Sequence, residues 1–276
     1  MSGDAQARRV GATATPLTIA TWNVNSLRVR LAQLAQWLDA NPTDVVALQE
    51  TKLADEHFPR AEVEALGYRA AHAGQPAYNG VAILSRLPLD ATVAGLPGSE
   101  DPQRRAIAVS VGGIRLINVY APNGQVVGSD KYAYKLRWYG QLERYLGAEL
   151  ARHERVLVVG DFNVAPADRD VHDPQAWLGS VLVSPEERAS LARLVGLGFS
   201  DLFRRFEQPP ESFTWWDYRQ GAYRRNHGLR IDLMLASPAL AAGCRFCRID
   251  REPRAWERPS DHAPCVAGFD LSSAAL

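Results

Sequence analysis

The stretch Ile107-Ala-Val-Ser-Val-Gly-Gly-Ile-Arg-Leu-Ile-Asn-Val119 decides the fold class, because two runs of alternating apolar residues meet at a glycine pair. Gly112 and Gly113 between such runs predict a two-residue hairpin, so the strands on either side should run antiparallel. A purely parallel, doubly wound sheet joins its strands through long crossovers and contains no such hairpin. The stretch therefore predicts a sheet that is at least partly antiparallel.

Strand and helix patterns alternate outward from this hairpin. Short apolar runs predict buried strands, and apolar residues three and four apart predict helices. The predicted strands are Leu17–Val24, Asp44–Leu48, Val81–Leu84, Ile107–Val111, Ile114–Val119, Val156–Val159, Ile231–Leu235 and Ala263–Phe269, with Phe213–Trp216 as a further short apolar segment. The predicted helices are Val29–Ala40, Tyr134–Leu150 and a third from Pro185 to about Leu197. The whole pattern indicates a strand-rich α/β protein.

The organisation of the chain is expected to be simple. No linker rich in glycine, serine or proline divides it, so we expect one domain over residues 17–271. Residues 1–16 are polar and alanine-rich and contain no apolar leader segment, which predicts a disordered N-terminal tail, with a short C-terminal tail at 272–276.

Composition excludes some classes of protein. Hydrophobic residues make up 46% and charged residues 22% of the 276 residues, as in an ordinary soluble protein. No apolar run approaches the roughly 20 residues that span a membrane, so no membrane association is expected. Three cysteines argue against a disulfide framework and for a reducing compartment such as a bacterial-type cytoplasm. The 31 basic and 31 acidic residues cancel, so any DNA binding must use a local basic patch.

Polar side chains follow several of the predicted strands directly. Asn23 and Asn25 follow Ile19–Trp22 of the first strand, Glu50 follows the second strand and Tyr120 the second strand of the hairpin. Asp161 and Asn163 come after Val156–Val159. Ligands of α/β sheets bind at the carboxyl ends of the strands. We therefore expect these side chains to converge on one cleft.

The acidic residues among them suggest a metal ion. Glu50, Asp161 and Asp261 would repel one another in one cleft unless a cation neutralised them, and Mg²⁺ prefers such oxygen ligands. Asn23 and Asn163 could donate hydrogen bonds to a phosphoryl oxygen without adding charge. The alternative is that the acids are helix caps or solvent-facing groups and that the asparagines are turn residues.

Three further residues could take part in the chemistry. Asp232, by accepting from one imidazole nitrogen of His262, would fix the tautomer of that ring and raise the basicity of its other nitrogen. Asp232 could instead form a salt bridge with Arg230. Tyr120 could donate its phenol to a phosphate, or simply end a buried strand.

Two other motifs contain residues that could carry chemistry. The segment Phe213-Thr-Trp-Trp-Asp-Tyr-Arg219 mixes aromatic and basic residues, a combination that suits stacking on bases or sugars and pairing with phosphates, although part of it could belong to the core. Cys244 and Cys247 have the CxxC spacing but no second pair of ligands, so we interpret them as structural.

Six motifs then carry a resemblance to a known family. They are Trp22-Asn-Val-Asn-Ser-Leu-Arg28, Leu48-Gln-Glu-Thr-Lys52, Asn118-Val-Tyr-Ala-Pro-Asn-Gly124, Gly160-Asp-Phe-Asn163, Gly228-Leu-Arg-Ile-Asp232 and Ser260-Asp-His262. In this order they resemble bacterial exonuclease III and the class II apurinic/apyrimidinic endonucleases of the endonuclease/exonuclease/phosphatase superfamily. One motif alone would be weak, but six in order are highly specific.

The resemblance implies a fold and an activity. The fold would be a DNase I-like, four-layer α/β sandwich, with two mixed β-sheets packed face to face and helices on both outer sides. The activity would be Mg²⁺-dependent DNA repair, with Mn²⁺ as a plausible substitute for Mg²⁺. The enzyme would cleave 5′ to abasic sites to leave a 3′-hydroxyl, with 3′-to-5′ exonuclease and 3′-phosphodiesterase or phosphatase activities. Its partner would be double-stranded DNA with abasic sites or 3′-blocked ends, bound by a monomer.

The resemblance also implies roles for individual residues. The catalytic set is Tyr120, Asp161, Asn163, Asp232 and His262. The metal set is Asn23, Glu50, Asp161, Asn163, Asp261 and His262. The substrate-binding set is Asn123, Trp215, Arg219, Leu229 and Ile231, of which Trp215, Leu229 and Ile231 match the pocket for a flipped, baseless sugar.

Some alternatives stay open at this point. Leu229 resembles the bacterial type, whereas animal relatives carry a tryptophan there, so the balance of exonuclease and endonuclease activity is not fixed. Either Asp161 or His262 could be the general base, and the site could hold one metal ion or two. A phosphatase or sphingomyelinase of the same superfamily shares the metal machinery, and a DNA-binding module without catalysis is a second rival.

Overall fold

The glycine pair forms the predicted hairpin. Strand β6 (Ala106–Val111) pairs antiparallel with β7 (Ile114–Tyr120), and Val111 lies opposite Ile114 across the turn. Gly112 and Gly113 have φ of 55° and 76°, the positive values that such a turn requires. This hairpin lies inside one of two six-stranded sheets of the computed structural model, which describes residues 16–271.

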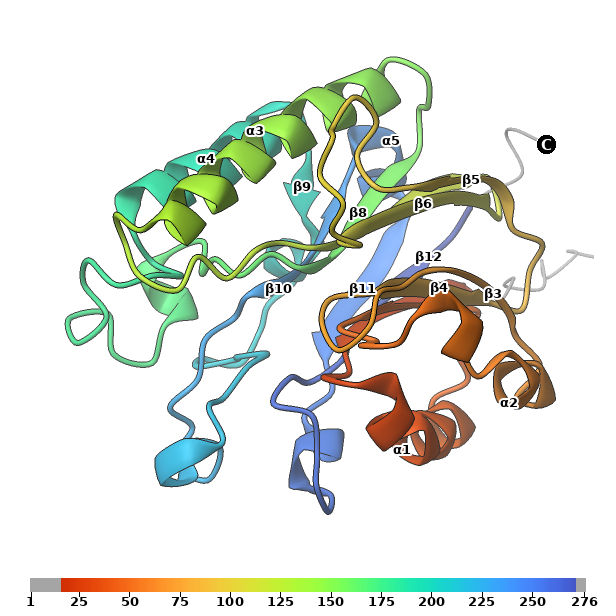
Figure 1. The fold of residues 1–276 in the computed structure, drawn as a ribbon, viewed down its shortest axis with the longest axis horizontal. Coiled ribbons are helices and arrows are strands. Elements are labelled where there is room, and N and C mark those ends of the chain that lie inside the picture. The colour runs from red at the N-terminus through yellow and green to blue at the C-terminus, as the bar shows by residue number, and fades with distance from the viewer. Residues whose placement is uncertain (1–15, 272–276) are drawn as a thin grey trace, which may run out of the picture.

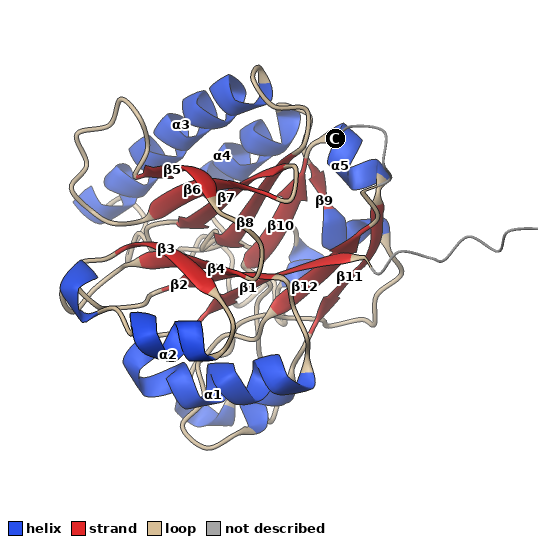
Figure 2. Cartoon of the chain, turned by 90° about the vertical axis from the view of Figure 1, so that its right-hand side faces the viewer, coloured by secondary structure: helices blue, strands red, loops and turns tan. Residues whose placement is uncertain are grey.

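Both sheets are mixed, and they pack face to face (Figures 1 and 2). Sheet A has the order β11-β12-β1-β2-β4-β3 and consists of β1 (Leu17–Asn23), β2 (Val45–Gln49), β3 (Arg69–Ala73), β4 (Val81–Ser85), β11 (Cys244–Ile249) and β12 (Cys265–Phe269). Sheet B has the order β5-β6-β7-β8-β10-β9 and adds β5 (Asp90–Ala94), β8 (Val156–Asp161), β9 (Ser200–Asp201) and β10 (Asp232–Ala236) to the hairpin.

Helices cover the outer face of each sheet (Figure 2). They are α1 (Leu27–Ala40) and α2 (Arg60–Ala65) on sheet A, α3 (Asp130–Leu150) and α4 (Pro185–Gly196) on sheet B, and the short α5 (Pro238–Ala242). Single 3₁₀ turns lie at Asp55–His57, Asp168–Asp170, Leu202–Arg205, Arg219–Gly221 and Glu252–Ala255. Helix α4 begins as its sequence predicts, because Ser184 and Glu187 form a capping box around Pro185.

Apolar residues fill three layers between these elements. Side chains of alternate strand residues point to opposite faces, so Ile19 packs between the sheets while its neighbour Ala20 packs under α1. Trp138 and Leu142 of α3 pack on the outer face of sheet B. The result is the predicted four-layer sandwich.

A polar contact ties the two sheets together next to the strand ends. Asn118 of β7 donates hydrogen bonds across the sandwich to the carbonyl oxygens of Leu48, at 2.8 Å, and Ala82, at 2.9 Å. Its own Oδ1 accepts from Gln49, at 2.7 Å. Because all these groups are buried and directional, they fix the spacing of the sheets at this level.

Several elements differ from the sequence-based expectation. Four strands, β3, β5, β9 and β11, and two helices, α2 and α5, were not predicted. Phe213–Trp216 forms no strand; Trp215 makes only isolated bridges, to Leu229 and His262. The predicted tails at 1–16 and 272–276 lie outside the described residues, apart from Pro16. Within residues 16–271 no helix is long and apolar enough to cross a membrane, and all three cysteines are free and buried.

The topology brings the chemically important strand ends to one end of the sandwich. β1 is parallel to β2, and β7 is parallel to β8, so each pair ends at the same edge. β10 runs antiparallel to β8, with Asp232 opposite Asp161, and β12 runs antiparallel to β1. The beginnings of β10 and β12 therefore lie beside the ends of β8 and β1.

The glycine before Asp161 is required by close packing. Gly160 has φ of +138°, and a Cβ atom there would lie 1.9 Å from the carbonyl oxygen of Val119. Any larger residue would push β8 away from β7, so the Gly-Asp sequence places the Asp161 carboxylate at a fixed point of the edge.

Candidate active site

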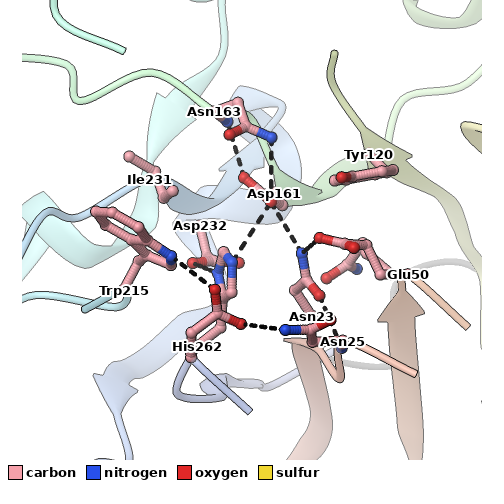
Figure 3. Close-up of polar contacts among 12 residues, drawn as sticks. Asn23, Asn25, Glu50, Tyr120, Asp161, Asn163, Trp215, Ile231, Asp232 and His262 are labelled. Atoms are coloured by element: carbon pink, nitrogen blue, oxygen red, sulfur yellow. Dashed lines mark hydrogen bonds and ion pairs between the residues drawn. The ribbon is translucent and has the colours of Figure 1, made fainter. Parts of the chain in front are cut away.

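Six side chains meet at the open end between the two sheets (Figure 3). Asn23, Glu50 and His262 come from the strand ends of sheet A, and Tyr120, Asp161 and Asp232 come from those of sheet B. Figure 3 shows Asp161 at the centre, joined by contacts to Asn163, Asn23 and His262. The site therefore exists only where the two sheets face each other.

A group of possible metal ligands lies at this centre. One ligand atom each from Glu50, Asp161 and His262 lies within 4.8 Å of the other two, and this is the one such group of three among residues 16–271. Two carboxylates with adjacent amide side chains suit a hard divalent cation that keeps part of its water shell. The residues present therefore fit a Mg²⁺ or Mn²⁺ ion.

Asp161 is buried but well supplied with hydrogen-bond donors. Its Oδ2 accepts from Asn23 Nδ2 at 2.9 Å and from Asn163 Nδ2 at 3.2 Å, and its Oδ1 accepts from the Asn163 backbone N–H at 2.8 Å. Burial nevertheless raises the pKa of Asp161 to about 7; the charge of His262 opposes this rise, and the carboxylates of Asp232 and Glu50 add to it. Asp161 is thus a carboxylate that can hold or release a proton near neutral pH.

His262 lies between two carboxylates. Its Nδ1 is 2.8 Å from Asp232 Oδ2, and its Nε2 is 3.7 Å from Asp161 Oδ2. Burial lowers the pKa of His262, but Asp232 and Asp161 outweigh this effect and raise the pKa to about 10. The ring is therefore protonated at neutral pH in the metal-free protein, and its Nε2–H points at the centre of the site.

Glu50 and Tyr120 form the opposite side of the centre. Glu50 accepts from Asn23 Nδ2 at 2.9 Å and forms an ion pair with Lys52 at 2.9 Å. Burial raises the pKa of Tyr120 well above its ordinary value, and the carboxylates of Glu50 and Asp161 raise it further. The Tyr120 phenol therefore keeps its proton at neutral pH and can donate a hydrogen bond.

Asp261 lies apart from this centre, although it was included in the predicted metal set. Its Oδ1 accepts from Asn25 Nδ2 at 2.9 Å, and its Oδ2 accepts from Trp215 Nε1 at 3.0 Å. Lys52 in turn donates to Asn25 Oδ1. In this structure Asp261 links the metal side of the site to the aromatic segment.

The predicted pocket residues Trp215, Leu229 and Ile231 lie together, beside Asp261. Trp215 and Leu229 exchange two backbone hydrogen bonds of 2.9 Å. Leu229 and Ile231 are buried in an apolar cluster with Leu182 and neighbouring residues, and the partly exposed Trp215 packs against that cluster. An apolar cluster whose exposed edge is formed by Trp215 thus adjoins the acidic centre.

The two other predicted substrate residues lie on the rim. Asn123 is exposed, and its Nδ2 donates to Asn163 Oδ1 at 3.3 Å. Arg219 is exposed and pairs with Asp217. A cavity of about 500 Å³ opens between the centre and the rim; among its lining residues are Glu50, Lys52, Tyr78, Arg105, Tyr120, Asn123 and Lys131.

Three residues that contact the site have no role in the predicted catalytic, metal or substrate sets, although Asn25 was noted among the polar residues after the first strand. Asn25 and Lys52 each stand two positions after a predicted site residue, and each has a positive φ, of 44° and 54°. This spacing was visible in the sequence, but the contacts that involve them join different elements. Lys135 is buried in α3 below Asn163, and nothing local in the sequence distinguishes it from a surface lysine of an amphipathic helix.

Comparisons with known proteins agree with this architecture. Residues 20–262 match the model of the Endonuclease/Exonuclease/phosphatase family. The chain is 37% identical over 262 residues to exodeoxyribonuclease III of Haemophilus influenzae. The matched region covers 90% of this chain and 98% of that protein. The solved structure of a 3′-phosphatase from Neisseria with a product DNA hairpin is 45% identical in sequence to this chain and superposes with a TM-score of 0.90. The match covers 92% of this chain and 99% of the Neisseria chain. The structure of an AP endonuclease from Archaeoglobus fulgidus is 39% identical in sequence and has a TM-score of 0.89. That match covers 92% of this chain and 100% of the Archaeoglobus chain.

Proposed function

Because this chain belongs to the endonuclease/exonuclease/phosphatase family, we propose that it is a divalent-metal-dependent DNA-repair nuclease of the exodeoxyribonuclease III type. It cleaves the DNA backbone 5′ to abasic sites to leave a 3′-hydroxyl, and it removes nucleotides and blocking groups from 3′ ends. Its substrate is double-stranded DNA, which it binds as a monomer. The relatives named exodeoxyribonuclease III, 3′-phosphatase and AP endonuclease support this range of reactions.

One observation carries the proposal. The Asp232–His262–Asp161 chain of contacts ends beside Glu50, and the apolar cluster that contains Ile231, the residue before Asp232, lies next to it. Phosphodiester hydrolysis needs the first group, and recognition of a sugar without its base needs the second. Both lie at one open end of the sandwich.

The metal ion would be held by the carboxylates of Glu50 and Asp161. When bound, a Mg²⁺ ion would neutralise these acids and stabilise the negative charge that develops on the phosphate. Lys52, paired with Glu50 at 2.9 Å, would have to share that carboxylate with the ion.

The chain's own residues would divide the remaining chemistry. His262, kept protonated by Asp232, would donate from Nε2 to a phosphoryl oxygen. Asp161 would accept the proton of the attacking water, because its buried carboxylate lies at the centre of the site, held by the amides of Asn23 and Asn163. The water oxygen forms a new bond to phosphorus as the P–O3′ bond breaks. The leaving 3′ oxygen takes up a proton from solvent, which leaves a 3′-hydroxyl on the upstream nucleotide and a 5′-phosphate on the abasic residue.

Asn163 and Tyr120 would bind the phosphate. Both carry donors that remain neutral at pH 7, so each can approach a phosphoryl oxygen without changing the charge of the site. The exposed Arg219 and Asn123 would contact DNA on either side of the centre.

The direct test uses a duplex that contains one tetrahydrofuran abasic analogue. With Mg²⁺, we expect the parent protein to nick it 5′ to the analogue and leave a 3′-hydroxyl that a polymerase can extend. A matched duplex with an intact nucleotide at that position should be nicked at least about 100-fold more slowly, because an intact base must also be unstacked and accommodated. Robust hydrolysis of inositol phosphates without any nicking would contradict the proposal and favour the phosphatase rival.

Metal binding should stabilise the fold more at high pH than at low pH. The raised pKa of Asp161 means that the metal-free folded state loses stability as the pH rises from about 4 to about 7, because the unfolded chain releases this proton first. A cation beside Asp161 favours the ionised carboxylate and removes that loss. We expect 5 mM Mg²⁺, relative to EDTA, to raise the thermal midpoint by about 5 °C or more at pH 8 and by under about 2 °C at pH 5.

Differential scanning fluorimetry at the two pH values measures this difference. The Asp161→Asn variant is the control, since it lacks the titrating group and should show little dependence of the metal effect on pH. An equal rise at pH 5 and pH 8 in the parent protein would contradict the assignment of Asp161 as the metal-linked acid.

A further inference from the structure

A buried lysine joins the loops that surround the site. Lys135 of α3 has a side chain that is 0% exposed. Its ammonium donates to the carbonyl oxygens of Asn123 at 3.0 Å and Asn163 at 2.6 Å, and to Glu187 Oε1 at 2.5 Å. These three acceptors satisfy all three donors of an ammonium group. Lys135 therefore holds the backbone of the two turns that carry Asn123 and Asn163, the asparagines proposed to contact DNA.

Its partner Glu187, also 0% exposed, extends the network to a further segment. Glu187 Oε1 accepts from the Leu182 N–H at 3.1 Å, and Oε2 accepts from Ser184 N–H at 3.1 Å and Ser184 Oγ at 2.6 Å. Leu182 belongs to the apolar cluster that includes Leu229 and Ile231. The ion pair thus connects the phosphate side of the site to the wall of the apolar cluster.

A second residue of α3 also binds the backbone of the turn that carries Asn163. Tyr139, one helical turn after Lys135, donates to the carbonyl oxygen of Phe162. Two side chains on one face of the helix therefore hold the consecutive carbonyls of residues 162 and 163. Asn163 has φ of 50°, an uncommon conformation for a residue other than glycine. The two hydrogen bonds from α3 help to maintain it.

The position of the ion pair in the fold suits such a role. α3 and α4 lie side by side on the outer face of sheet B (Figure 1), and Lys135 and Glu187 join them where both helices begin. Burial lowers the pKa of Lys135, and the charge of Glu187 acts against that shift. Each charge is thus compensated by the other.

We propose, resting on the function proposed above, that Lys135 and Glu187 are a positioning pair. They fix Asn163 and Asn123 relative to Leu182, which forms one wall of the apolar cluster (the Leu182 wall). In this way they determine the turnover number of the nuclease without contacting DNA. Burying two charges carries a desolvation cost, and neutral replacements of such a pair often leave fold stability unchanged or increased.

The chain contains a matched control pair. Arg115 and Glu149 form an ion pair of 2.5 Å, with side chains 4% and 5% exposed. Glu149 lies on the same helix α3, and Arg115 lies at the opposite end of β7 from Tyr120. The Arg115–Glu149 pair is therefore a buried ion pair between a basic residue and a glutamate, like Lys135–Glu187, but it lies far from the site.

The experiment compares two double variants, Lys135→Met with Glu187→Gln and Arg115→Met with Glu149→Gln. Steady-state kinetics on the abasic duplex are measured together with the thermal midpoint of each variant. For the Lys135/Glu187 variant we expect kcat to fall about 100-fold with KM within about threefold, because displacements of about 1 Å cost roughly this much. The Arg115/Glu149 variant should keep kcat within about twofold of the parent.

The possible outcomes separate this inference from the proposed function. A folded Lys135/Glu187 variant with kcat within about threefold of the parent, or equal losses in both double variants, overturns the positioning role and leaves the nuclease assignment intact. A parent protein that does not nick the abasic duplex overturns both.

A single variant keeps the inference testable if the Lys135/Glu187 double variant does not fold. Glu187→Gln retains the Lys135 contacts to the two carbonyl oxygens but weakens the support of the Leu182 wall. A 3′-terminal phosphate has no sugar to place against that wall, whereas an internal abasic site has one. We expect Glu187→Gln to slow abasic incision at least about fivefold more than release of a 3′-phosphate. Equal slowing of the two reactions overturns the inference.

Discussion

The Asp161→Asn variant is expected to nick the abasic duplex about 10³- to 10⁴-fold more slowly than the parent, with its affinity for the duplex within about tenfold. The substitution keeps the shape of the side chain but removes the carboxylate that would take the proton of the attacking water. It also removes a charge that the metal ion needs. The Asn23 and Asn163 donors, which now point at Asp161 Oδ2, would face an amide instead.

Single-turnover rates with Mg²⁺ measure the chemical step, and fluorescence anisotropy in EDTA measures duplex affinity. Asp168→Asn is the matched control, since Asp168 lies in the loop after β8 but its side chain is 71% exposed and pairs with Arg188. The control should keep its rate within about twofold. An Asp161→Asn rate within tenfold of the parent would remove Asp161 from the catalytic centre.

His262 and Asp232 are expected to act as one unit. His262→Ala should lower the incision rate about 10³-fold or more, and Asp232→Asn about 10²-fold or more, because Asp232 acts by keeping His262 protonated and oriented. The double variant should then be no more than about threefold slower than His262→Ala alone. The 2.8 Å contact between the two side chains is the physical reason for this non-additivity.

This double-mutant cycle is measured from the single-turnover rates of the parent, the two single variants and the double variant. His153→Ala serves as the control, since that histidine is partly exposed at the end of α3 and belongs to no predicted site. Rate losses that multiply in the double variant would mean that Asp232 and His262 act independently. Thermal midpoints are needed alongside, because each single variant leaves a buried group without its partner.

The fold was predictable where local patterns are strong. The hairpin at Gly112–Gly113, the long helix α3 and the buried strands of both sheets follow from periodicity and turn chemistry. The resemblance added the four-layer arrangement, which the structure and its similarity to solved relatives confirm. β3 and β5 were missed because both are edge strands whose exposed residues show no apolar alternation. The two-residue β9 is too short to leave any pattern.

The site was predictable to a different extent. Polar residues directly after predicted strands indicated Glu50 and Asp161, because ligands of α/β sheets bind at the carboxyl ends of strands. That the two residues come from different sheets was not visible in the sequence. The separation of Asp261 from Glu50, and its contacts with Asn25 and Trp215, depend on side-chain directions that no spacing reveals. Lys135 illustrates the same limit, since its importance arises only from the turns that pack above it.

The division of the centre between the two sheets has a consequence for its assembly. Sheet A takes β1–β4 from the beginning of the described chain and β11 and β12 from its end, whereas sheet B is formed entirely by the segment between them. A chain that contains Glu50 and Asp161 but ends before β12 lacks His262, which lies three residues before the start of β12, the last strand described. The complete set of reactive groups therefore first comes together when β12 pairs with β1, so the centre depends on contact between the two ends of the described chain.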